Sequence, residues 1–104
     1  MKEIHPLISQ KTQQEIFKNS YVQVDRSEYE GKTYSSAPFY KQFNTNQYLF
    51  EVAGTVDITW KNKEEYNFGR VSSISVTMYD DAGEVFPDDK IYNVFENKLQ
   101  FSII

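Results

Sequence analysis

The sequence predicts a single α+β domain over residues 1–104, in which an N-terminal helix packs on a curved antiparallel β-meander of five or six strands. Three observations support this fold class. A chain of 104 residues suits one hydrophobic core. Apolar and polar residues alternate over residues 47–60 and again over residues 66–79, as in half-buried strands. Near the N-terminus, apolar residues follow helical spacing instead.

The two alternating segments are predicted to pair as a long β-hairpin across a charged turn at residues 61–65. Gly54 interrupts the apolar face of the first strand, which is typical of a bend or β-bulge in a long curved strand. The apolar faces consist of Tyr48, Phe50, Val52, Val56, Ile58 and Trp60 in the first strand, and of Ile74, Val76 and Met78 in the second.

Residues 7–19 are predicted to form the N-terminal helix, since Pro6 suits a first helical position. Thr12 and Glu15 have the spacing of a capping box, which allows a later start. Residues 21–24 then form a short strand by composition. The face expected to pack on the sheet contains Leu7, Ile8, Thr12 and Ile16, with Phe17 beside them.

Residues 25–38 contain few aliphatic side chains and many Ser, Tyr, Glu and Gly residues. We therefore expect a long loop with a short strand near residues 33–34. Residues 39–43 are predicted to form a further strand, which ends at the turn-prone residues 44–46.

The segment after the hairpin begins with a predicted turn at residues 80–83 and a short strand at residues 85–86, stopped by Pro87. At the C-terminus, residues 96–98 are expected to turn into a final strand over residues 99–104, where apolar residues alternate.

Residues 88–97 allow two interpretations. Ile91, Val94, Phe95 and Leu99 match helical spacing, with Asp88 as an N-cap. Residues 91–95 are also a good strand by composition. We favour the strand, which completes the meander.

Acidic residues outnumber basic ones by 15 to 11, which gives a formal net charge of −4. This balance argues against a phosphate-binding surface, so we expect no direct contact with nucleic acid. It is compatible with a basic protein partner, because opposite fields steer the encounter of two proteins. Ordinary solubility is the alternative explanation of the charge.

The chain has no cysteine, which excludes disulfides, thiolate metal sites and cysteine nucleophiles. No apolar stretch of signal-peptide length follows Met1, and the longest apolar runs are only a few residues. We therefore expect a soluble, cytoplasmic protein without a membrane contact.

Motifs that carry chemistry are missing from the sequence. His5 is the only histidine and has no neighbouring acid cluster, so it is weak evidence for a metal ligand or a general base. The four glycines are far apart, which excludes a phosphate-binding loop. Residues 80–84 are acidic, but Ala82 stands where an EF-hand needs an oxygen ligand. We expect no enzymatic activity, no cofactor and no metal.

Two features are candidates for partner binding. The first is the acidic stretch at residues 80–89, which contains Asp80, Asp81, Glu84, Asp88 and Asp89. Such a cluster at one end of a sheet presents a local negative field to basic side chains of a partner. The alternative is that these acids act only as turn formers and helix caps.

The second candidate is a group of tyrosines, Tyr29, Tyr34 and Tyr40, with Phe39 among them. Tyrosine supplies a large contact area at low entropic cost, as in binding loops. The alternative is that these rings cover one end of the core. A third route is strand addition at an unpaired sheet edge.

These features together predict a small acidic binding protein. The specific expectation is an immunity protein that neutralises a cognate toxin, such as a nuclease, by covering its basic active site; a phage-encoded inhibitor has the same physical features. One alternative is a small-ligand-binding or enzymatic domain with a pocket between sheet and helix, lined by Gly54 and Trp60. Another is a structural or oligomeric subunit.

Overall fold

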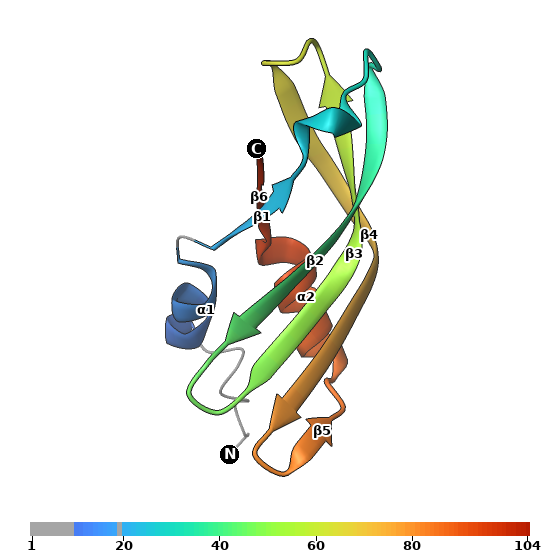
Figure 1. The fold of residues 1–104 in the computed structure, drawn as a ribbon. Helices are drawn as coiled ribbons and strands as arrows, with labels where there is room; N and C mark the ends of the chain where they lie inside the picture. Colours follow the sequence, from blue (N-terminus) through green and yellow to red (C-terminus); the bar gives the residue numbers. More distant parts are fainter. Residues whose placement is uncertain (1–9, 19) are drawn as a thin grey trace.

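The computed structural model describes residues 10–18 and 20–104 (Figure 1). The elements follow one another in the order α1 (Gln10–Phe17), β1 (Tyr21–Val24), the short 3-10 helix η2 (Arg26–Glu28), β2 (Tyr34–Asn44), β3 (Leu49–Trp60), β4 (Tyr66–Asp80), β5 (Gly83–Val85), α2 (Asp89–Lys98) and β6 (Gln100–Ile103).

The α+β class is confirmed, but the strands of the described residues divide into two sheets rather than one meander. An antiparallel sheet has the order β2-β3-β4-β5. β1 and β6 pair parallel with each other and form a separate two-stranded sheet. Ile104, which follows β6, is tied to the β1 side of this pair: it donates from its N–H to the Val24 carbonyl at 2.9 Å, and the Arg26 N–H donates to the Ile104 carbonyl at 3.1 Å.

The predicted long hairpin is confirmed as β3 and β4, which pair in antiparallel register from Leu49 opposite Tyr79 to Trp60 opposite Tyr66. The even-numbered apolar residues of β3 face the core as the alternation predicts. The buried ones are Phe50, Val52, Val56, Ile58 and Trp60, of which the first four are fully buried.

A bulge lies opposite Gly54, since β3 advances two residues from Ala53 to Thr55 while β4 advances three; the extra residue therefore belongs to β4 and not to the strand of Gly54, as the sequence had suggested. A Cβ atom at Gly54 would lie 3.0 Å from the Phe39 ring on the neighbouring strand β2. Glycine is therefore required here because the buried ring of Phe39 fills the space that a side chain would occupy.

Two bulges also explain an irregular spacing in β4. Phe68, Val71 and Ile74 are three residues apart, yet all three pack against the core. At each register shift β4 advances three residues while β3 advances two, which returns the next apolar side chain to the same face. Ser73 takes up one of these irregularities with a φ of 53°.

The prediction of a strand within residues 88–97 is wrong, because this segment forms α2. The Asp88 side chain caps the helix by accepting a hydrogen bond from the Ile91 N–H at 3.1 Å. Ile91 and Phe95 lie one turn apart and are both buried. The β-forming composition is overridden since the apolar face of the sheet needs a helix to cover it. The predicted turn at residues 96–98 is accordingly the last turn of α2.

α2, not the N-terminal helix, lies along the sheet (Figure 1). In α1, Phe17 contacts Phe43 and Phe95 with ring centroids 5.6 Å apart in each pair, so this helix packs at one end of the core. The predicted start of this helix at residues 7–9 lies outside the described residues.

The prediction of a long loop over residues 25–38 extends the loop too far, because β2 begins at Tyr34 and continues through Pro38. Small polar residues obscured the alternation, in which Ser35, Ala37 and Phe39 are buried and their neighbours are exposed. Trp60 donates from its Nε1 to Ser35 Oγ at 2.7 Å, which satisfies the buried hydroxyl.

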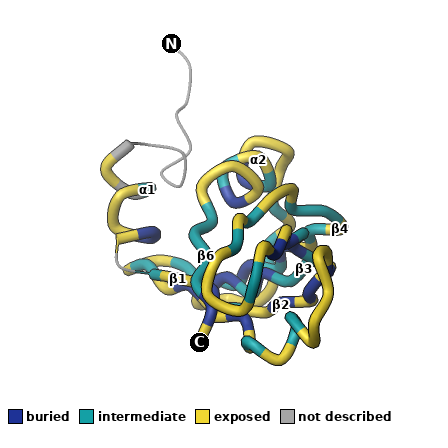
Figure 2. The backbone as a smooth tube through the Cα atoms, turned by 90° about the horizontal axis from the view of Figure 1, so that it is seen from above, coloured by how far each residue is buried: buried dark blue, intermediate teal, exposed yellow. Residues whose placement is uncertain are grey.

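Aromatic side chains fill the inner side of the sheet along its length. Phe95 of α2 packs on Phe50, with centroids 5.2 Å apart, and Phe101 of β6 packs on Phe39 at the same distance. Viewed from above, α2 and β6 lie on one side of the β2–β4 sheet, with buried residues between them and the strands (Figure 2). The core is therefore one-sided, and the β-rich core accounts for most of the aromatic residues.

Replacement of Gly54 by alanine is expected to destabilise the protein by about 1–3 kcal/mol, because the added methyl group overpacks the space filled by Phe39. Chemical denaturation measures this change. A Phe39→Leu substitution in the Gly54→Ala background should show favourable coupling in a double-mutant cycle. Gly69→Ala is the control, since its Cβ would meet Asp57 at an ordinary 3.5 Å. Equal losses for the two glycine substitutions contradict the close packing.

Candidate functional site

The face of the four-stranded sheet that points away from α2 is called the open face here. None of the other described elements lies over it in the ribbon of Figure 1 or in the backbone tube of Figure 2. Its centre carries small side chains, and tyrosines and carboxylates lie toward both ends. The register and the alternation place on this face Tyr34, Ser36, Pro38, Tyr40, Gln42, Glu51, Ala53, Thr55, Asp57, Ser75, Thr77, Tyr79 and Glu84.

A hydrogen-bonded row crosses the open face near the β4–β5 turn. Tyr40 of β2 donates from its hydroxyl to Glu51 Oε2 at 3.0 Å, and Tyr79 of β4 donates to Glu51 Oε1 at 3.3 Å. Gln42 Nε2 donates to the Tyr40 hydroxyl at 3.1 Å and to Glu51 Oε2 at 3.3 Å. The carboxylate of Glu51 therefore fixes the two tyrosine rings on either side of it.

The row continues onto β5, because Glu84 lies directly opposite Tyr79 in the β4–β5 register. Burial raises the pKa of the Tyr79 hydroxyl, and the negative charges of Glu51 and Glu84 raise this pKa further. We call Tyr40, Gln42, Glu51, Tyr79 and Glu84 the tyrosine–carboxylate row. It spans all four strands and joins one predicted tyrosine to one predicted acid.

A second tyrosine–carboxylate cluster lies farther along the open face. Ser36 Oγ donates to Asp57 Oδ1 at 3.1 Å. A side-chain hydrogen bond with Asp57 raises the pKa of Tyr34, and the charge of Asp57 acts in the same direction. Tyr34 and Tyr40 are both more than half exposed and come from the same side of β2.

Tyr29 does not join the other two predicted tyrosines. Its ring packs on Trp60, with centroids 5.2 Å apart, and it is partly buried against the core. For this residue the alternative interpretation holds, since the ring covers one end of the core. Tyr34 and Tyr40 lie on a strand rather than on the expected loop.

The predicted acidic residues lie around β5 and the start of α2, at one end of the sheet (Figure 1). Two of them have structural roles: Asp80 Oδ1 accepts from the Ala82 N–H at 2.8 Å in the turn, and Asp88 caps α2. Asp81, Glu84 and Asp89 are exposed. Among the described residues, neither ion pair (Arg26–Glu64 and Lys32–Glu30) includes any of these five acids.

Glu51, Asp57 and Tyr79 belong to the open face but were not predicted as site residues. The signal was present in the alternation, since Glu51 and Asp57 occupy polar positions of the clearest strand. Choosing them required the strand order, because the acid on β3 meets the tyrosines only after β2 and β4 pair on either side of it.

A comparison of the chain with protein-family models finds no match, and comparisons with curated proteins and with solved structures find none either.

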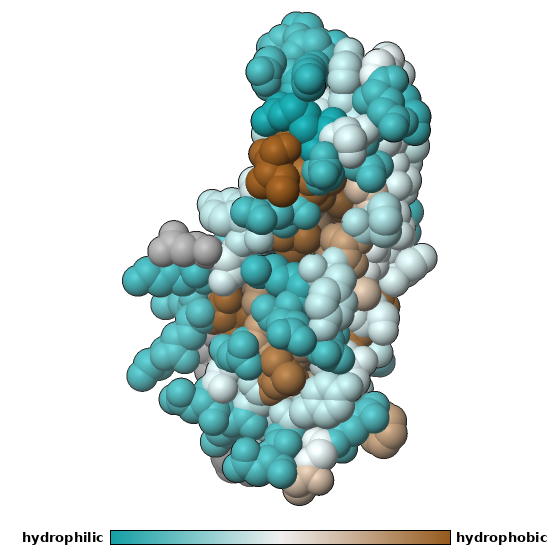
Figure 3. All heavy atoms as spheres, viewed as in Figure 1, coloured by the Kyte–Doolittle hydropathy of each residue, from teal (hydrophilic) through white to brown (hydrophobic). Residues whose placement is uncertain are grey.

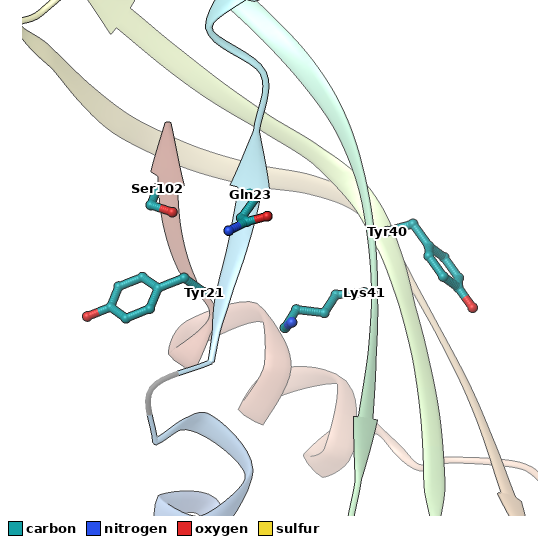
Figure 4. Close-up of a pocket in the computed structure, with 5 residues that line it drawn as sticks. All are labelled: Tyr21, Gln23, Tyr40, Lys41 and Ser102. Atoms are coloured by element: carbon teal, nitrogen blue, oxygen red, sulfur yellow. The ribbon is translucent and has the colours of Figure 1, made fainter. Parts of the chain in front are cut away.

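Grooves lie away from the open face. One of about 660 Å³ between β1 and β2 is lined by Tyr21, Gln23, Tyr40, Lys41 and Ser102. In Figure 4 Lys41 points toward β1, whereas Tyr40, the preceding residue of β2, points to the other side of the strand. Another groove, of about 500 Å³, lies between β4 and the end of α2 and includes Arg70 and Glu96.

On the inner side of the sheet, the space beside Gly54 and Trp60 where a pocket was anticipated is filled by side chains; the groove that Trp60 lines lies instead at the β3–β4 turn, with Lys61 and Glu64. The Phe39 ring occupies the space over Gly54, and Trp60 is only 2% exposed. Among residues 10–18 and 20–104, no group of three or more potential metal ligands is close enough to hold a metal ion. None of the helices in this part of the chain is long and apolar enough to cross a membrane. His5 lies outside the described residues.

Removal of the Glu51 charge by Glu51→Gln is expected to lower the pKa of Tyr79 toward its ordinary value of about 10, because the tyrosinate no longer faces that carboxylate. NMR titration of labelled tyrosines measures the pKa of Tyr79. Tyr34, which interacts with Asp57, should keep its raised pKa. Glu96→Gln on α2 is the control.

The sign of the accompanying stability change follows from linkage. The folded-state pKa of Tyr79 lies above the unfolded value, so its proton stabilises the fold at neutral pH. This contribution is lost as the pH rises through the raised pKa. An unchanged Tyr79 titration in Glu51→Gln contradicts the described row.

Proposed function

We propose that the protein acts by binding another protein through the open face and the adjoining acidic end, and that the bound surface of the partner is basic. One observation supports the proposal above others: the tyrosine–carboxylate row connects Tyr40, on the far strand, to Glu84, in the acidic stretch. The two features expected from the sequence to bind a partner thus belong, in part, to one continuous surface.

The form of this surface suits a macromolecule. Its centre carries Pro38, Ala53 and Thr55, whose side chains are small, so no long side chain projects from the sheet between the tyrosine clusters. Tyr40 and Tyr79 are held by Glu51, so little side-chain entropy is lost when a partner covers them. Tyrosine is among the residues that are enriched at protein interfaces.

The charge of the surface favours a cationic partner. Glu51, Asp57 and Glu84 place three carboxylates on the open face. Of the two basic residues within strands β2–β5, Lys41 points toward β1 (Figure 4), and Arg70 lines the groove between β4 and the end of α2. Such a field accelerates encounter with basic proteins and opposes the approach of nucleic acid.

In its specific form, the proposal is an inhibitor that works in the cytoplasm as an immunity protein. Its carboxylates would occupy the basic active site of a toxin, such as a nuclease, and exclude the phosphates of the substrate. A phage-encoded inhibitor of a basic host protein uses the same chemistry. A basic protein encoded beside the gene is the first partner to test.

Asp81→Lys combined with Glu84→Lys is expected to weaken binding of an oligoarginine peptide, and of a basic partner protein, by at least about tenfold. Fluorescence anisotropy at several salt concentrations measures the affinity, which should fall steeply with salt in the unmodified protein. Asp80 and Asp88 are left unchanged because they hold the turn and the cap of α2.

The matched control is Glu30→Lys combined with Glu65→Lys, which changes the net charge equally at exposed positions outside the acidic end. This control should change the affinity by no more than about threefold, because it acts only through long-range electrostatic steering. Equal loss in both double variants, or a salt-independent affinity, contradicts the proposed surface.

A further inference from the structure

Phe86 is the most exposed large hydrophobic side chain of the described residues. It is 85% exposed, whereas Tyr40 and Tyr34 are 57% and 55% exposed. The tyrosines carry hydroxyls that water can solvate, but a phenylalanine ring has no polar atom. Phe86 also stands at the end of the molecule that carries β5, where the surface in Figure 3 is mostly hydrophilic.

The backbone on both sides of Phe86 is fixed. Val85 pairs with Met78 in the β4–β5 ladder and packs against the core. After Phe86, Pro87 restricts the preceding residue to extended backbone, and Asp88 caps α2 through the N–H of the buried Ile91. The ring is therefore carried on a short rigid segment, and docking it costs little backbone entropy.

Acidic side chains flank this ring in the sequence and in the fold. Glu84 precedes it by two residues and lies opposite Tyr79 on the open face. Asp88 and Asp89 follow it at the start of α2. An apolar anchor with a charged rim is the arrangement in which a few residues supply most of the binding energy of an interface.

We propose that Phe86 is the apolar anchor of the interface, and that it inserts into an apolar pocket bordered by lysine or arginine on the partner protein. This inference rests on the proposed function and adds the chemistry of the partner's surface. The negative charge favours a protein over a membrane as the partner that takes up Phe86, because the carboxylates around this residue repel anionic lipid headgroups.

Peptides selected from a random phage-displayed library on the full chain provide a probe that assumes no partner. We expect them to combine arginine or lysine with a large apolar residue. Phe86→Ala should lower the affinity for the selected peptides at least tenfold, and Phe86→Leu should retain most of that affinity. Since Phe86 is exposed, circular dichroism and thermal unfolding should show both variants folded like the unmodified protein.

Tyr21→Ala is the matched control, because it removes a half-exposed ring from β1, beyond the opposite edge of the sheet from β5. Tyr21→Ala should change the affinity for the selected peptides by less than about twofold. Basic peptides that bind Phe86→Ala as tightly as the unmodified protein overturn the anchor but leave the proposed function standing. Peptides without basic residues, or a selection that yields none, overturn the proposed function together with the anchor.

Discussion

The sheet buries only one of its two faces, and the other features of the molecule depend on this constraint. Strands β2 to β4 are long and curved, and the space on their inner side is filled by α2, by β6 and by rings such as Phe39 and Phe95. Curvature of this kind requires Gly54, where the Phe39 ring leaves no room for a side chain. The bulges in β4 then keep Phe68, Val71 and Ile74, which are three residues apart, on the core side.

The same alternation that builds the core also produces the candidate site. Each buried residue of β3 has neighbours that point to the open face. Because Val52 points into the core, the adjacent Glu51 points to the open face. Pairing with β2 and β4 then brings Tyr40 and Tyr79 to the two oxygens of that carboxylate. These hydrogen bonds restrain both tyrosine rings on the surface, which favours binding to a macromolecule over binding that needs a deep cavity.

Regular periodicity made part of this structure predictable. The hairpin of β3 and β4 followed from residues spaced two apart, and the irregularity opposite Gly54 followed from the glycine that interrupts this alternation. The segment around Tyr92 and Val94 was misassigned because its composition favours a strand, while the Asp88 cap and the burial of the inner sheet face favour a helix. The exposed acids and Tyr40 could be identified from composition. The role of Glu51 could not, because it depends on the strand order. The exposure of Phe86 depends on the path of the chain between β5 and α2, and no local sequence pattern specifies that path.

All of these features require that the outer side of β3 faces solvent in the isolated protein, while the inner side is shielded from water. NMR of methyl groups in the presence of a paramagnetic cosolute tests it most directly. The structure predicts strong relaxation of the Ala53 and Thr55 methyls and little effect on those of Val52, Val56 and Ile58, which are fully buried. Equal protection of both sets contradicts the account, because it means that another element or a second molecule covers the open face.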